Sequence, residues 1–79
     1  MTMFRFVQSG WYETRFPVSG VRYALIYVSR MDCAALERPH WNIHPLRADG
    51  TLDAPCDAES TLKGAKSLIL LMSCVLDQN

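Results

Sequence analysis

The chain has 79 residues, of which 49% are apolar, and eight Lys or Arg balance eight Asp or Glu. This length predicts a single domain, residues 1–79, and the apolar content excludes a disordered tail. The formal net charge of zero argues against a protein that binds nucleic acid through a broad basic surface, and equally against a strongly acidic mimic of nucleic acid.

Alternating residues predict two short strands near the N-terminus, at 4–7 and 11–16, separated by the turn residues Gln8-Ser9-Gly10. In the second segment, Tyr12, Thr14 and Phe16 share one face, while Trp11, Glu13 and Arg15 share the other. The two segments form either a hairpin or one longer strand bent at Gly10. Pro17 ends the second segment because it cannot donate to a strand ladder.

The segment 21–29, which follows a turn at Val18-Ser19-Gly20, predicts the central strand. It is apolar on both faces, and a strand of this kind is usually covered on both. Residues 31–39 predict a loop with one helical turn at 33–36, for which Asp32 is a plausible cap.

A further strand is predicted from His40, with Trp41 and Ile43 on one face and Pro45 at a strand end or edge. Ala48-Asp49-Gly50 then predicts a turn, and Thr51-Leu52 the start of a return strand.

The last element is a helix capped by Asp57 and running to about Leu76. Apolar residues spaced three and four apart form its predicted core stripe, namely Leu62, Ala65, Ile69, Met72 and Leu76. The predicted fold class is α+β, an antiparallel sheet of three to four strands with one C-terminal helix packed on it.

The helix carries more apolar surface than one core stripe needs. Leu70 falls nearly opposite the stripe, near Cys74, and Leu71 lies on its flank. Either the 31–39 loop covers this side, or it is a partner surface. Leu70, Leu71 and Cys74 are therefore one candidate contact set, and exposed residues of the sheet are a second: Trp11, Arg15, Arg22, His40 and His44.

Catalytic and metal sites find little support. On a strand, His40 and His44 lie about 13 Å apart, too far for one ion, so no metal is expected. Cys33, Cys56 and Cys74 show no metal or disulfide spacing and are expected as reduced thiols. Cys56 precedes the predicted cap and is the one candidate nucleophile, but no third catalytic group or oxyanion loop accompanies it. No cofactor is expected.

Targeting signals are also missing from the pattern. The apolar run at 68–76 is far shorter than the roughly 20 residues that span a bilayer, and the N-terminal residues do not form a leader. We therefore expect a cytoplasmic protein without a membrane partner.

Three segments of the second half carry a family resemblance: Trp41-Asn42-Ile43-His44, the turn at 48–50 and the helix opening at 60–66. Their layout resembles small accessory proteins of phages and mobile elements, including anti-CRISPR inhibitors. The resemblance implies a binder of a host protein or nucleoprotein complex that blocks it sterically, and it carries over no functional residues.

The leading hypothesis is thus a non-enzymatic protein-interaction module, with a homodimer as one form that the interaction could take. The alternative is a small nucleic-acid-binding domain, because aromatic residues alternate with arginines at 4–6, 11–16 and 22–23.

Overall fold

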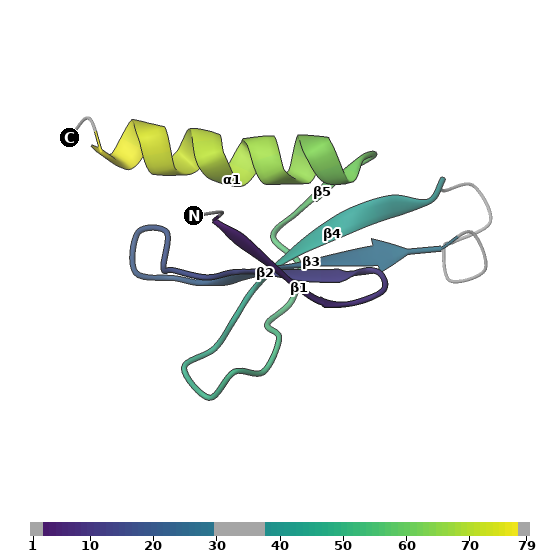
Figure 1. Ribbon diagram of the computed structural model, residues 1–79, viewed down its shortest axis with the longest axis horizontal. Coiled ribbons are helices and arrows are strands. Elements are labelled where there is room, and N and C mark those ends of the chain that lie inside the picture. Colours follow the sequence, from purple (N-terminus) through teal and green to yellow (C-terminus); the bar gives the residue numbers. More distant parts are fainter. Residues whose placement is uncertain (1–2, 30–37, 78–79) are drawn as a thin grey trace.

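The structure is a computed structural model that describes residues 3–29 and 38–77. These residues form, in chain order, β1 (Phe4–Gln8), β2 (Trp11–Thr14), β3 (Tyr23–Val28), β4 (His40–Pro45), β5 (Asp57–Glu59) and α1 (Leu62–Asp77). All strands join one antiparallel sheet in the order β1-β2-β3-β4-β5, so each strand pairs with its neighbours in the chain (Figure 1). The α+β prediction is confirmed, with five strands rather than three or four.

The first two strands form the hairpin, not the single bent strand. Gly10 has a φ of 76°, which a tight turn requires and glycine adopts without strain. The hairpin register pairs Arg5 with Glu13 and Phe6 with Tyr12, and it shifts between Phe6 and Gln8. Successive side chains point to opposite faces, so this register sets the partners on each face.

The strand predicted as central, β3, does lie in the middle of the sheet between β2 and β4. It starts at Tyr23, after a turn in which Ser19 and Gly20 have positive φ. Ala24 and Leu25 are fully buried, on opposite faces of this strand. Strand β4 starts at His40 and ends at Pro45, as the alternation predicts.

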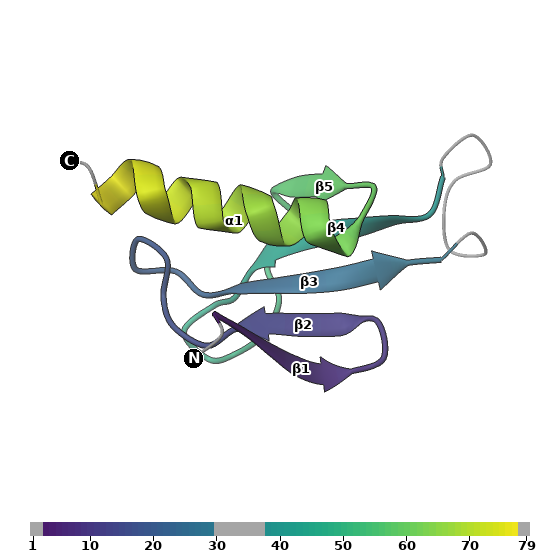
Figure 2. The same ribbon diagram turned by 45° about the horizontal axis from the view of Figure 1, so that its top comes forward.

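The helix covers only one face of the sheet, where it packs chiefly on β4 and β5 (Figures 1 and 2). The buried core between them consists of Val18, Leu25, Ile43, Ala65 and Ile69. Lys66 extends from α1 over β1 and β2, with its ammonium 5.5 Å from the ring centre of Phe4 and 4.8 Å from that of Tyr12. We call the side without the helix the open face.

The predicted helix cap at Asp57 is wrong. Residues Asp57–Glu59 pair with β4 as the fifth strand, and the helix starts at Leu62. The hydroxyl of Thr61 accepts the backbone N–H of Gly64 at 2.9 Å and caps the helix instead. The physical reason is that the backbone at 57–59 forms its hydrogen bonds with β4. A prediction from the local sequence alone does not include this pairing.

The connection between β4 and β5 differs in detail from the prediction. The turn at 48–50 is present, with Gly50 at a φ of 87°, but Leu52 makes only an isolated bridge to Leu46. The predicted loop turn at 33–36 and its cap Asp32 lie outside the described residues. Within the described residues, no helix is long and apolar enough to cross a membrane.

Candidate contact surfaces

Strand alternation places the phenylalanines of β1 and the arginine between them on opposite faces of the sheet. Phe4 and Phe6 share the helix-side face, where Phe4 packs against the core. Arg5, between them, lies on the open face and pairs across the hairpin with Glu13. Aromatic and basic residues that alternate along β1 therefore contribute to two different surfaces of the sheet.

The first surface is a line of contacting rings on the helix-side face, which we call the aromatic strip: Phe6, Tyr12, Trp41 and Tyr27. Tyr12 contacts Phe6 edge-on, with ring centres 5.5 Å apart, and Trp41 at 6.0 Å. Trp41 in turn lies 5.3 Å from Tyr27. The inner rings pack against the core, whereas Phe6 is 61% and Tyr27 43% exposed. Both ends of the strip are thus accessible.

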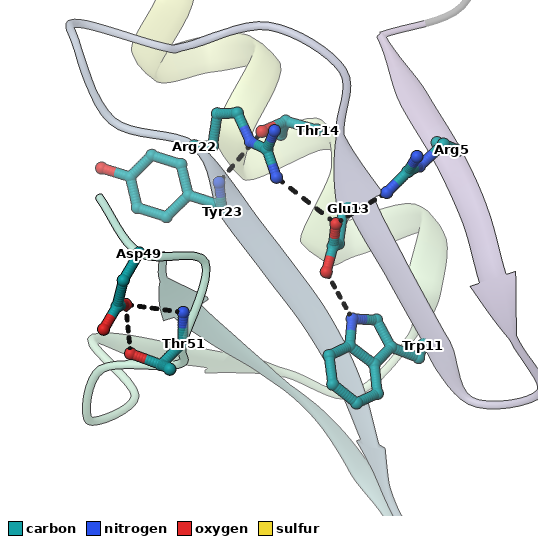
Figure 3. A network of polar contacts seen from close by, with 8 residues as sticks. All are labelled: Arg5, Trp11, Glu13, Thr14, Arg22, Tyr23, Asp49 and Thr51. Atoms are coloured by element: carbon teal, nitrogen blue, oxygen red, sulfur yellow. Dashed lines mark hydrogen bonds and ion pairs between the residues drawn. The ribbon is translucent and has the colours of Figure 1, made fainter. Parts of the chain in front are cut away.

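The second surface is centred on Glu13, which is only 8% exposed on the open face. Its Oε1 accepts hydrogen bonds from Arg5 at 3.1 Å and from Arg22 at 3.5 Å. Its Oε2 accepts the indole N–H of Trp11 at 3.0 Å. Figure 3 shows the three donors converging on this carboxylate from β1, from β2 and from Arg22, which directly precedes β3. One buried charge thereby holds three long side chains in place.

A hollow of about 380 Å³ opens beside this network. We call it the arginine hollow, and its lining is Arg5, Thr14, Arg15, Phe16 and Arg22. Thr14 is buried, and its hydroxyl accepts the backbone N–H of Tyr23 at 2.9 Å, which joins β2 to β3 at this end (Figure 3). The structure thus brings together Arg15 and Arg22 from the predicted contact set, with Trp11 attached through Glu13.

The two histidines occupy separate positions along β4, and each binds backbone. Nδ1 of His40 lies 2.8 Å from the carbonyl oxygen of Arg38, and Nδ1 of His44 lies 2.9 Å from that of Asp53. The part of the chain that the structure describes has no group of three His, Cys, Asp or Glu side chains that could hold a metal ion.

The candidate nucleophile Cys56 is not at a helix N-terminus, since it directly precedes β5. Its thiol donates to the carbonyl oxygen of Ile43 at 3.5 Å. Partial burial raises the pKa of this thiol, and the neighbouring charge of Asp57 raises it further. A raised pKa lowers the thiolate fraction at neutral pH, so this environment does not activate the sulfur.

The helix surface agrees with the predicted pattern where side chains are described. Leu70 is 44% and Leu71 60% exposed, while Ile69 is fully buried. The third member of that set, Cys74, lies beyond the described side chains.

Sequence reasoning considered Phe6 only in the nucleic-acid alternative. It did not select Tyr27 or Trp41 as contact residues, nor Glu13 as the organiser of the arginines. The turn at Gly10 was not a sufficient signal, because a two-residue turn that pairs Gln8 with Trp11 would by itself place Phe6 beside Glu13. The register shift between Phe6 and Gln8 is what places Arg5 beside Glu13 and Phe6 beside Tyr12. Comparisons of this chain with protein-family models, with curated proteins and with solved structures found no match.

Proposed function

We propose that this chain is a small non-enzymatic module that binds another protein through the aromatic strip. The observation that carries the proposal is the exposure of Phe6 and Tyr27 at the two ends of a continuous line of rings. Tyr and Trp are enriched among residues that dominate binding energy, because they bury large area for little side-chain entropy. A connected patch of this kind differs from the single exposed apolar residues found on any protein.

The geometry favours a protein partner over nucleic acid. Sites that bind single strands combine stacking rings with a positively charged groove on the same surface. Here the rings lie on the helix-side face, where Lys66 contacts the ring of Tyr12, whereas Arg5 and its partner Glu13 lie on the open face. An apolar protein surface is therefore the partner chemistry that fits the strip. Steric inhibition of a host complex remains the prediction that the family resemblance implies.

A binding role also fits the chemistry of Cys56, His40 and His44. The raised pKa of Cys56 favours the thiol, and His40 and His44 each direct Nδ1 to a backbone carbonyl.

Photo-crosslinking in the source cell tests the proposal. A benzophenone amino acid replaces Phe6, and the adduct is identified by mass spectrometry. We expect one discrete protein adduct that persists after nuclease treatment and is lost in a Tyr27→Ser background. Loss on nuclease treatment would instead favour the nucleic-acid alternative, and an adduct with the chain itself would identify a homodimer.

The matched control is Val7→Ser, which alters a 40% exposed apolar residue on the same strand as Phe6 that takes no part in the ring contacts of the strip. It should leave the adduct unchanged. Circular dichroism melting curves of each variant confirm that the fold is retained. An adduct that forms equally well with Tyr27→Ser would overturn the assignment of the strip as the contact.

A further inference from the structure

The arginine hollow carries more positive charge than the surrounding chain neutralises. Arg5 and Arg22 share one acceptor, Oε1 of Glu13. Arg15 forms no ion pair or side-chain hydrogen bond with any residue that the structure describes. Three guanidinium groups against one carboxylate leave a local charge of +2 on a chain with a net charge of zero.

The guanidinium groups remain accessible although two of them are held in place. The side chains of Arg5 and Arg22 are 56% and 43% exposed, respectively, whereas that of Glu13 is 11% exposed. A guanidinium has five N–H donors, and each of these two spends one on Glu13. Most of their donors therefore have no acceptor among the described residues and can bind an external anion, in an orientation that the buried carboxylate already fixes.

We propose that the arginine hollow binds a phosphate monoester group. Such a group carries a charge of about −1.5 to −2 at neutral pH, which matches the unbalanced charge, whereas a carboxylate or a phosphodiester carries about −1. Its three terminal oxygens suit the forked donors of arginine, which bind phosphate in bidentate fashion.

The hollow also has room for the molecule that bears the phosphate. A volume of about 380 Å³ exceeds that of a phosphate group, so part of the carrier fits as well. Phe16, 49% exposed, supplies an apolar wall for that part. The carrier is a phosphorylated side chain or a small phosphorylated molecule. No residue of the aromatic strip lines this site, so the site does not depend on binding through the strip.

Calorimetric titration of the purified full chain tests the proposal. The probes are N-acetylphosphoserine amide, a phosphoserine pentapeptide, glucose 6-phosphate and dimethyl phosphate. We expect the monoesters to bind at least about tenfold more tightly than dimethyl phosphate, which has one charge. Tighter binding of the pentapeptide identifies a phosphoprotein as the source, and tighter binding of glucose 6-phosphate identifies a small molecule.

Two variants of equal charge locate the site. Arg15→Gln removes a side chain without partners among the described residues, so the fold should persist while monoester affinity falls about tenfold. Lys63→Gln removes one charge from an exposed position of α1 and should leave the affinity unchanged. Equal losses in both variants, unchanged binding in Arg15→Gln, or equal affinity for dimethyl phosphate would overturn the proposal. So would a single-stranded oligonucleotide that displaces phosphoserine at equal phosphate concentration.

Discussion

The indole N–H of Trp11 donates to Oε2 of Glu13 at 3.0 Å, between two residues that lie on the same face of β2. This bond occupies one oxygen of the carboxylate and directs the other toward Arg5 and Arg22. The position of the two arginines beside the hollow therefore depends on a residue that does not line it.

Replacement of Glu13 should destabilise the fold through this network. We expect Glu13→Ala to lower the free energy of unfolding by about 1–3 kcal/mol. The substitution leaves the Trp11 N–H without its acceptor and exposes part of the open face of the sheet to water. The exposed arginines contribute less, since solvent screens their charge. Urea denaturation followed by tryptophan fluorescence measures the effect. Glu13→Gln retains an acceptor and should lose less; equal stability of all three proteins would contradict this account.

The corrected helix start gives a second prediction. Thr61→Ala removes the cap of the Gly64 N–H and should cost about 1 kcal/mol, within the range of 0.5–2 for such caps. Asp57→Ala, at the position that the sequence favours as cap, should change stability by less than about 0.5 kcal/mol because Asp57 is exposed. Thermal unfolding of the two variants distinguishes the assignments, and the reverse order of effects would contradict the structure.

Adjacent residues of the helix should respond in opposite ways. Ile69→Ala empties a fully buried site and should cost about 2–5 kcal/mol in unfolding free energy. Leu70→Lys changes a 44% exposed side chain and should leave the fold intact. Light scattering of Leu70→Lys then tests the helix as a self-association surface. A dimer mass that falls to that of the monomer would show such a dimer, and an unchanged mass would exclude it.

The turn at Asp49 gives a pH-dependent prediction. The hydroxyl and backbone N–H of Thr51 both donate to Asp49 and hold its pKa below the ordinary value of 3.8. A lowered folded-state pKa stabilises the fold above pH 3.8, and this contribution is lost as the pH falls through the folded pKa. Thr51→Val should therefore raise the pKa of Asp49 toward 3.8.

An NMR titration of the carboxyl carbons measures this change and contains its own control. The pKa of Asp53 is lowered chiefly by the backbone N–H of Ala54 and by Arg47, so Thr51→Val should not move it. An unchanged Asp49 titration would contradict the role assigned to Thr51.

The strands that could be predicted are those whose own residues specify them. The alternation around Tyr12 and Glu13 and the apolar run of β3 each indicate a strand without knowledge of its neighbours. Strand β5 has no such local signal, because Asp57, Ala58 and Glu59 are poor strand formers. Strand β5 forms because it pairs with β4. The predicted helix cap at Asp57 was wrong because of this same pairing.

The candidate sites show the same limit. Exposure of Leu70 follows from helical periodicity alone, and the structure agrees. The convergence of Arg5 and Arg22 on Glu13 needs the register of three strands, which depends on the turns that join them. The aromatic strip likewise joins β1 through β4 and could not be read from any single segment.

The sequential strand order has a consequence for how the chain reaches its folded state. Each strand pairing joins neighbours in the chain, so the sheet can grow by successive short loop closures at small entropic cost. The helix follows the sheet in the chain and leaves the ribosome after it, and until the helix docks, Leu25 and Ile43 face water. During synthesis the nascent sheet therefore carries an uncovered apolar face, and a chain truncated before Leu62 should aggregate rather than persist as a smaller domain.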